Sequence, residues 1–557
     1  MNTDLPTTDG ARERRPHGPR RRASTLLAAA VLVLLFAPLA WFLLDRPDEL
    51  LPAYPFTEDA FYYFAVADHF SRGQIDVGAQ GEYENGFQPL QAVLLTPVML
   101  AARLTAGGDY HYAALRWFAV VHLALLVAVV VAVVWLVRRL SQAASPEGRD
   151  PPLWPSVALG GGLVLVNPRL VEGLLNGQET ALLVLGVLVL LGLLLARRPY
   201  RGETVLLPVV CGLVVLARID AVVLAVGALI VWEVMRRRRS ALLLLHDWGL
   251  FALTCGWWFV LNLVKTGSPL QSSGGALMRG TVPVDVTGNL HVAFDVAARL
   301  TAVEAAVRIA ASRVTRALGS NLELDPDRLA TLDAVVAVGY WSAVALALWW
   351  LYRRARGDRP LRRLLPLAPF AVYCLALCAF YVWLFAAWWF LGRYLAPIEA
   401  LATVAEATLA VVLLERALAT STGWRLAAAV AAVVVALPLA GRYVSDLGLL
   451  RQPRQIPTYA RHFTLVRDLP PDARVASFQS GVLSYFRPAT INLDGKMNRD
   501  ALAAVRSHSV LDYLLDRQIE YVIEWQPVSD RYLTAAFAQR FEVVASIGDT
   551  KLWRRKD

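Results

Sequence analysis

Two adjacent carboxylates, Glu58 and Asp59, are the residues best placed in the sequence to do chemistry. They follow the first apolar run and precede the aromatic stretch 61–70, which could lie flat on a membrane surface. A carboxylate held there could accept a proton from a hydroxyl group, or bind a divalent cation such as Mg²⁺ or Mn²⁺. The structural alternative is a helix cap, because Thr57 and Asp59 also suit a helix N-terminus.

Further polar groups stand at the ends of other apolar runs. They are Asn85 with Gln88, Glu179, Arg218 with Asp220, and Arg393 with Tyr394. Ionisable groups are costly in a membrane, so each is a candidate for function. Glu179 could instead cap a helix, and Arg218 and Asp220 could form a structural ion pair. Arg393 stands among aromatic residues, where its guanidinium could either bind a lipid phosphate or anchor the interface.

The composition indicates what kind of protein positions these residues. Of 557 residues, 57% are hydrophobic and only 18% are charged, whereas a soluble protein carries roughly a quarter charged residues. We therefore expect a polytopic membrane protein. The net charge of +10 lies in short arginine blocks between apolar runs, which fits membrane topology and gives no reason to expect a nucleic-acid partner.

The apolar runs predict about eleven transmembrane helices, several of them shorter than the ~20 residues a span needs. They cover residues 25–44, 114–136, 154–166, 180–195, 206–216, 221–235, 242–263, 332–352, 364–383, 395–414 and 426–440. The arginines before residue 25 place the N-terminus in the cytoplasm, although a cleaved signal peptide is an alternative for the first run. Eleven spans leave the C-terminus outside, and the internal arginine blocks then all face the cytoplasm.

We expect three regions. Residues 1–24 form a basic cytoplasmic tail, and residues 25–440 form an all-α transmembrane domain with outer loops at 45–112 and 266–330. Residues 441–557 form an extracytoplasmic α/β domain, with strands at 474–478, 490–493, 521–524 and 551–554 and helices at 459–469, 502–507 and 511–517. Residues 89–104 are too short for a span and predict an interfacial or re-entrant helix, and residues 292–318 are amphipathic.

Taken together, these strings resemble the GT-C superfamily of membrane glycosyltransferases, which use polyprenyl-phosphate sugars. The resemblance is nearest to arabinofuranosyl- and mannosyltransferase-like members. It covers most of the chain and rests on E-D-A-F-Y-Y at 58–63, N-G-F-Q-P-L at 85–90, G-Q-E-T at 177–180, R-I-D at 218–220, R-Y-L-A-P at 393–397, Q-S-G at 479–481 and N-L-D-G at 492–495 with Asn498. It departs from the family pattern at Glu58, Gln88, Gln91 and Ile219, where the family has aspartate, histidine, tryptophan and proline.

The resemblance implies a multi-pass enzyme of the plasma (inner) membrane that moves a sugar from a polyprenyl-phosphate donor to an extracytoplasmic glycan, lipid or protein acceptor of the cell envelope, inverting the anomeric carbon. Asp59 or Glu58 would be the base, and Arg393, then Arg218, would stabilise the leaving phosphate. The other donor-side candidates are Tyr394, Asp220, Glu179, Asn85 and Gln88. The acceptor-side candidates are Gln479, Asn492 and Asp494, of which Asn492 and Asp494 could equally shape a turn.

A transporter or flippase for a lipid-linked sugar or other anion is the alternative function. The short, Gly- and Pro-interrupted runs at 154–235 are typical of a transport site. Against it, the second half has no matching interrupted pair, and the polar groups gather at one face. A structural or scaffolding role would leave those groups unexplained. The sequence has neither a P-loop nor a G-x-G-x-x-G string, so a nucleotide-driven enzyme is not expected.

Overall fold

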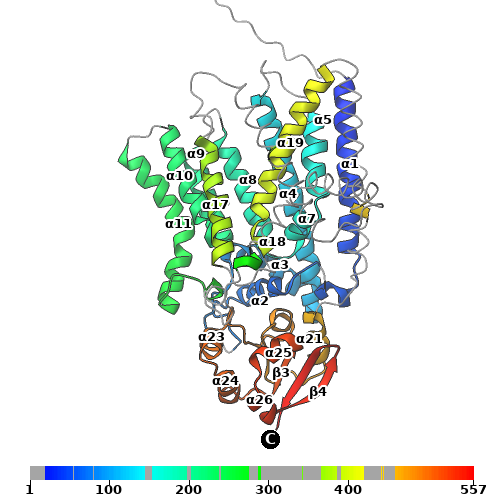
Figure 1. Cartoon of the computed structure of the whole chain (residues 1–557), viewed down its shortest axis with the longest axis vertical. Coiled ribbons are helices and arrows are strands. Elements are labelled where there is room, and N and C mark those ends of the chain that lie inside the picture. The colour runs from blue at the N-terminus through cyan, green and yellow to red at the C-terminus, as the bar shows by residue number, and fades with distance from the viewer. Residues whose placement is uncertain are drawn as a thin grey trace, which may run out of the picture.

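The computed structural model describes residues 19–53, 55–79, 81–144, 153–196, 202–236, 240–274, 286–289, 342, 365–384, 391–419, 441, 443–444 and 458–556. Long helices lie side by side, and a small α/β domain lies beyond one end of them (Figure 1). The helices of the first part are α1 (Pro19–Leu44), α2 (Glu58–Ser71), α3 (Pro89–Ala106), α4 (Tyr110–Ala144), α5 (Leu153–Pro155), α6 (Gly162–Leu165), α7 (Pro168–Leu175), α8 (Thr180–Leu194), α9 (Glu203–Ala217), α10 (Val222–Arg236), α11 (Ala241–Thr266), α17 (Ala368–Trp383), α18 (Leu391–Tyr394) and α19 (Ala396–Ala419). Shorter segments are η1 (Asp48–Ala53), η2 (Gly107–Asp109), η3 (Ser156–Gly161), η4 (Ile219–Ala221) and η5 (Leu365–Leu367).

The expected count of eleven spans is not confirmed. Within the described residues, six helices are long and apolar enough to cross a membrane, or seven if the bent pair at 153–175 is one span. The arms predicted at 180–195, 206–216 and 221–235 form helices of 15 residues each, shorter than the ~20 residues a span needs. Apart from residue 342, the spans predicted at 332–352 and 426–440 lie outside the described residues, as do the amphipathic run at 292–318 and the N-terminal tail to residue 18.

Helices α2 and α3 fill the space between the long helices and the α/β domain (Figure 1). The expected helix at 61–70 is present, but its aromatic side chains at 61–64 are buried inside the protein. Phe61 and Phe64 are fully buried and meet Phe56, Phe118 and Tyr485 edge-on or stacked. Helix α3 begins with proline at its first position, where the missing N–H costs nothing. Its 18 residues meet the length and hydropathy of a span, so its expected interfacial placement stays a prediction.

The α/β domain contains α21 (Thr458–Val466), β1 (Val475–Ser477), α22 (Gly481–Phe486), β2 (Ile491–Asn492), α23 (Arg499–Arg506), α24 (Val510–Asp516), β3 (Tyr521–Trp525), α25 (Gln526–Tyr532), α26 (Ala535–Arg540), β4 (Phe541–Ile547) and β5 (Thr550–Arg555). The strand order is β2-β1-β3-β5-β4. Strand β1 runs parallel to β2 and β3, while β5 runs antiparallel to β3 and β4. The four predicted strands and three predicted helices are all present, and β4 completes a hairpin that the sequence analysis missed.

Helix α22 joins the α/β domain to the membrane part. Val482 and Tyr485 are buried in the same hydrophobic core as the long helices. The Tyr485 hydroxyl donates to the carbonyl of His111, 2.8 Å away at the start of α4. Gly481 leaves room for the carbonyl of Glu58, which a Cβ atom there would overlap. The α/β domain is therefore packed directly onto the helix that begins with the two candidate carboxylates.

Candidate active site

A cavity of about 880 Å³ lies where the membrane helices meet the α/β domain. Its size falls within the range of roughly 300–1,000 Å³ typical of ligand pockets. Its walls come from α2, the 86–88 loop, the 178–179 turn, η4 with α10, α17, α18 and α23. Of the predicted site residues, the cavity is lined by Asp59, Gln88, Glu179, Arg218, Asp220, Arg393 and Tyr394.

Asp59 is held between two cations inside this cavity. Its Oδ2 accepts a hydrogen bond from Arg393 Nη1 at 2.6 Å, and its Oδ1 lies 3.1 Å from Lys496 Nζ. These partners come from positions 334 and 437 residues away in the chain. Burial alone would raise the pKa of Asp59, but Lys496 and Arg393 outweigh it and hold that pKa well below its ordinary value. The carboxylate is therefore ionised and fully paired.

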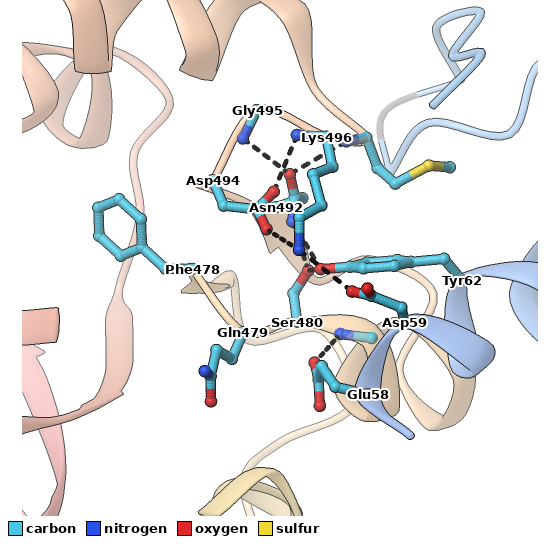
Figure 2. A network of polar contacts seen from close by, with 12 residues as sticks. Glu58, Asp59, Tyr62, Phe478, Gln479, Ser480, Asn492, Asp494, Gly495 and Lys496 are labelled. Carbon is cyan, nitrogen blue, oxygen red and sulfur yellow. Dashed lines mark hydrogen bonds and ion pairs between the residues drawn. The ribbon is translucent and has the colours of Figure 1, made fainter. Parts of the chain in front are cut away.

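Lys496 reaches Asp59 from a tight turn that follows β2 (Figure 2). Asn492 holds the turn, since its Oδ1 accepts from the backbone N–H groups of Gly495 and Met497. Gly495 adopts a φ of +78°, which favours glycine. Asp494 accepts the backbone N–H of Lys496 and also pairs with its Nζ at 3.2 Å. The turn thus fixes a cation of the α/β domain against the carboxylate of α2.

The same turn is clamped to the first loop of the membrane part. A Cβ atom on Gly86 would overlap the carbonyl oxygen of Lys496. That carbonyl accepts from Ser272 Oγ at 2.7 Å. Gly86 and Ser272, both far from Lys496 in the sequence, therefore contact the same Lys496 carbonyl group. A Cβ atom at position 86 would displace that carbonyl, so the site needs glycine there.

Glu58 does not line the cavity, although it is adjacent to Asp59. Its Oε1 accepts the backbone N–H of Gly481 at the start of α22 (Figure 2). Its Oε2 is buried without a hydrogen-bond partner. Burial raises the pKa of Glu58 to about 8, so the side chain is largely protonated at neutral pH. Asp59 is therefore the candidate base, whereas Glu58 joins α2 to α22 of the α/β domain.

Three of the described residues orient Arg393. Besides Asp59, it donates to Gln178 Oε1 at 2.7 Å and to the Tyr394 hydroxyl at 2.8 Å. Glu179, next to Gln178, accepts from the Tyr63 hydroxyl at 2.7 Å. The Gly177–Thr180 string is thus part of the site, and its Gln178 was not among the candidates chosen from the sequence.

Arg218 and Asp220 form the ion pair that the sequence left open. The Arg218 Nη2 lies 2.6 Å from Asp220 Oδ2 and also donates to the carbonyl of Tyr394. Asp220 accepts from the Tyr381 hydroxyl at 2.6 Å as well. Arg218 and Asp220 both line the cavity. Arg218 also lies 5.0 Å from the centre of the Tyr394 ring, so it supports the residue that directly follows Arg393.

Asn85 and Gln88 hold the segment after α11. Asn85 is fully buried, and it bonds the backbone of Leu270 and Ser272. Gln88 donates to Gln271 Oε1 at 2.9 Å. Asn85 does not line the cavity, so we assign it a supporting role, whereas Gln88 lines the wall.

The three acceptor-side candidates lie outside the cavity. Asn492 uses its Nδ2 on Tyr62 and Ser480 and its Oδ1 on the turn. Asp494 bonds Lys496, and the side chain of Gln479 points away from Asp59 (Figure 2). The turn-forming role that the sequence left open for Asn492 and Asp494 therefore describes their contacts better than sugar binding does.

The residues around Asp59 do not fit a divalent cation. Both Asp59 oxygens already face positive groups, and Glu58 is turned toward Gly481. Among the described residues, no three His, Cys, Asp or Glu side chains are grouped to hold a metal. Cations from side chains occupy the place where Mg²⁺ or Mn²⁺ was considered.

Lys496, Arg499 and Arg506 also line the cavity and were missed by the sequence analysis. Lys496 directly follows the Asn492-to-Gly495 string, so its position on a turn was readable. Nothing in the sequence alone indicated that this turn meets Asp59, because the contact depends on how two domains dock.

Comparison with solved structures of other proteins identifies the fold of the chain. No protein-family model and no curated protein matches the chain. Among solved structures, ArnT from Cupriavidus metallidurans bound to undecaprenyl phosphate aligns over 95% of this chain and 97% of its own, with a TM-score of 0.53 and 14% identity. The oligosaccharyltransferase of Archaeoglobus fulgidus in the apo form aligns over 91% of this chain and 69% of its own, with a TM-score of 0.50 and 12% identity.

The chain has the GT-C fold. It is a multi-pass membrane protein with a small sheet at its C-terminal end. The alignment with ArnT spans nearly the whole of both chains, so the shared fold includes the α/β domain as well as the helices.

Proposed function

We propose that this GT-C protein is a glycosyltransferase that moves a sugar from a polyprenyl-phosphate donor to a hydroxyl group of an extracytoplasmic glycan, lipid or protein. One observation carries the proposal. An ionised carboxylate, Asp59, stands between two half-buried cations in a cavity that also has an apolar wall. Undecaprenyl phosphate bound to ArnT is the kind of ligand that such a cavity suits.

The proposed reaction is one displacement. Asp59 removes the proton of the acceptor hydroxyl, the acceptor oxygen bonds to the anomeric carbon, and the bond from that carbon to the phosphate oxygen breaks. The bonding electrons leave with the phosphate, which changes from a monoanionic diester to a dianion, while Asp59 becomes neutral. Arg393 and Lys496 are placed to stabilise the added charge. Attack opposite the leaving group would invert the anomeric carbon.

Donor binding would also make Asp59 a stronger base. In the structure both oxygens of Asp59 are engaged by Arg393 and Lys496, which makes it a weak base. A donor phosphate entering between these cations competes for them, and the pKa of Asp59 then rises toward its ordinary value. Deprotonation of the acceptor would thereby be tied to the presence of donor.

The first test uses Asp59→Asn. The purified protein in nanodiscs is given a panel of polyprenyl-phosphate sugars with candidate acceptors, with and without chelator, and release of polyprenyl phosphate is measured. We expect a loss of about 10²–10⁴-fold, because the base is gone. The control is Asp472→Asn, which changes an exposed aspartate of the α/β domain. Near-normal turnover by the folded Asp59→Asn protein would refute Asp59 as the base.

The same protein preparation can distinguish a transporter from a glycosyltransferase. The short, interrupted runs at 154–235 suggested a transporter, and within them the structure has a helix pair at 153–175 that is bent by 72°. Movement of a lipid-linked sugar across proteoliposomes with no cleavage of the sugar–phosphate bond would favour a flippase.

A further inference from the structure

Three parts of the cavity wall differ in chemistry. The first carries Asp59 with Arg393 and Lys496. The second is apolar and comes from α10 and α17, with Val222, Val223, Ala376, Leu377 and Phe380. The third is one face of α23, in the α/β domain. The first two suit the phosphate and the hydrocarbon of the proposed donor, so the third is left for a different ligand group.

The α23 face is regular and basic. Arg499, Leu502, Ala503 and Arg506 all line the cavity. They are spaced i, i+3, i+4, i+7, which places them on one side of a helix. The two arginines are seven residues apart, or about 10 Å along the helix. The face therefore presents two guanidinium groups with a small apolar strip between them.

We propose that this face binds an anionic group, a carboxylate or a phosphate, carried by the acceptor. The inference rests on the proposed transferase and names the class of its acceptor. The acceptor would lie along α23 with its anionic group on the arginines. Lys496 precedes Arg499 by three residues and contacts Asp59, so an acceptor hydroxyl near the start of α23 would be close to the base.

The charges already present support a ligand at Arg499. Among the described residues, three carboxylates line the cavity, and all three are bonded elsewhere. Asp59 pairs with Arg393 and Lys496, Asp220 with Arg218, and Glu179 accepts from Tyr63. The donor phosphate has Arg393 and Lys496 nearby and does not need α23.

Among the described residues, the Arg499 side chain donates to two uncharged oxygens, the carbonyl of Thr266 at 3.1 Å and Asn85 Oδ1 at 3.4 Å. Glu84 and Asp500 are acids close to α23 or on it. Glu84 accepts the backbone N–H of Arg499, and burial raises its pKa to about 7. Asp500 pairs with Arg517 at the exposed side. Arginine binds carboxylate and phosphate through paired donors, which makes such a group the chemistry that this face recognises.

The experiment measures binding directly. Full-length protein in phosphatidylcholine nanodiscs is titrated with a short oligosaccharide bearing a uronic acid and with its carboxyl-reduced twin, then with a phosphorylated oligosaccharide and its dephosphorylated twin. We expect one charged form to bind about tenfold or more tightly than its neutral twin. Arg506→Gln and Arg499→Gln should each weaken that preference, and the double variant should abolish it. Arg540→Gln, an exposed arginine outside the cavity, should leave it unchanged.

Each other outcome overturns the inference. The proposal is wrong if no charged probe binds more tightly than its neutral twin, or if the double variant keeps the preference. It is also wrong if the preference exists only for phosphatidylglycerol introduced into the nanodiscs, since the arginines would then hold a lipid head group. Arg506 is exposed, so Arg506→Gln remains informative if Arg499→Gln disturbs domain docking. Acceptor-independent release of polyprenyl phosphate, measured in parallel, tests the transferase separately.

Discussion

Glu58 and Asp59 show how far two neighbouring residues can differ. Successive residues of an α-helix point about 100° apart, so Asp59 faces the cavity while Glu58 faces α22. Two cations lower the pKa of Asp59, whereas burial raises that of Glu58 to about 8. The sequence identified the acidic pair but left both residues as possible bases. The choice depends on the surroundings of each carboxyl group.

Lys496 is the residue that most needs a test at this scale. Lys496→Ala should lower kcat by about 10²–10³-fold, because the leaving phosphate loses a cation. It should also move the acid limb of kcat/KM to higher pH. Asp59 acts only when ionised, so activity falls as the pH drops through its pKa. Removing Lys496 raises that pKa, and the fall then begins at a higher pH.

Lys496→Arg is the matched variant for this experiment. It keeps the positive charge and should retain part of the rate and the pH profile of the unaltered protein. A purely structural role for Lys496 would lower the rate of Lys496→Ala while leaving the acid limb in place. That result would remove Lys496 from the proposed chemistry.

At the scale of elements, the sequence predicted what local patterns determine. The span at 25–44, the start of α2, and strands β1, β2, β3 and β5 follow from apolar runs and turn residues, and all are present. Strand β4 was missed although it pairs with β5, because its residues are largely exposed and their pattern shows no buried face. Helix α22 was missed because it has only six residues, and Val482 and Tyr485 are buried through packing against the membrane part, which no local pattern reports.

Gly86 links two elements and gives a prediction at their contact. Gly86→Ala should reduce sugar transfer by roughly 10²-fold, because the added Cβ displaces the turn that carries Lys496, and small misplacements at a catalytic centre have costs of this order. Transfer and thermal unfolding are measured on the same preparation. Gly108→Ala is the control, since a Cβ there meets nothing within 4 Å. Unchanged transfer by Gly86→Ala would show that the turn can move without loss.

At the scale of the whole molecule, the α/β domain is part of the candidate site. It supplies Lys496, Arg499 and Arg506 to the cavity, and it is fixed to the membrane part by α22 and by Gly86. The sequence predicted this domain and expected it to shape the acceptor side, but it did not predict that the domain would reach the catalytic carboxylate. Contacts that span more than four hundred residues depend on packing between two domains.

The orientation of the molecule in the membrane gives the last prediction. Asp59 and the α/β domain lie at one end of the helices, and Arg138 and Arg236 lie toward the opposite ends of α4 and α10. Because arginine-rich ends stay in the cytoplasm, the site should face outward. Asp468→Cys, at a side chain that is 83% exposed in the α/β domain, should therefore react with a membrane-impermeant maleimide in intact spheroplasts.

The unaltered protein is the background control, since Cys211 and Cys255 are buried and all four native cysteines lie in helices α9, α11 and α17. Glu233→Cys at the far end of α10 should react only after permeabilisation, because it lies beside Arg236. The reverse labelling pattern would place Asp59 in the cytoplasm. A donor flipped to the outer face could then not reach it, and the proposed reaction would have to use a donor on the side where it is made.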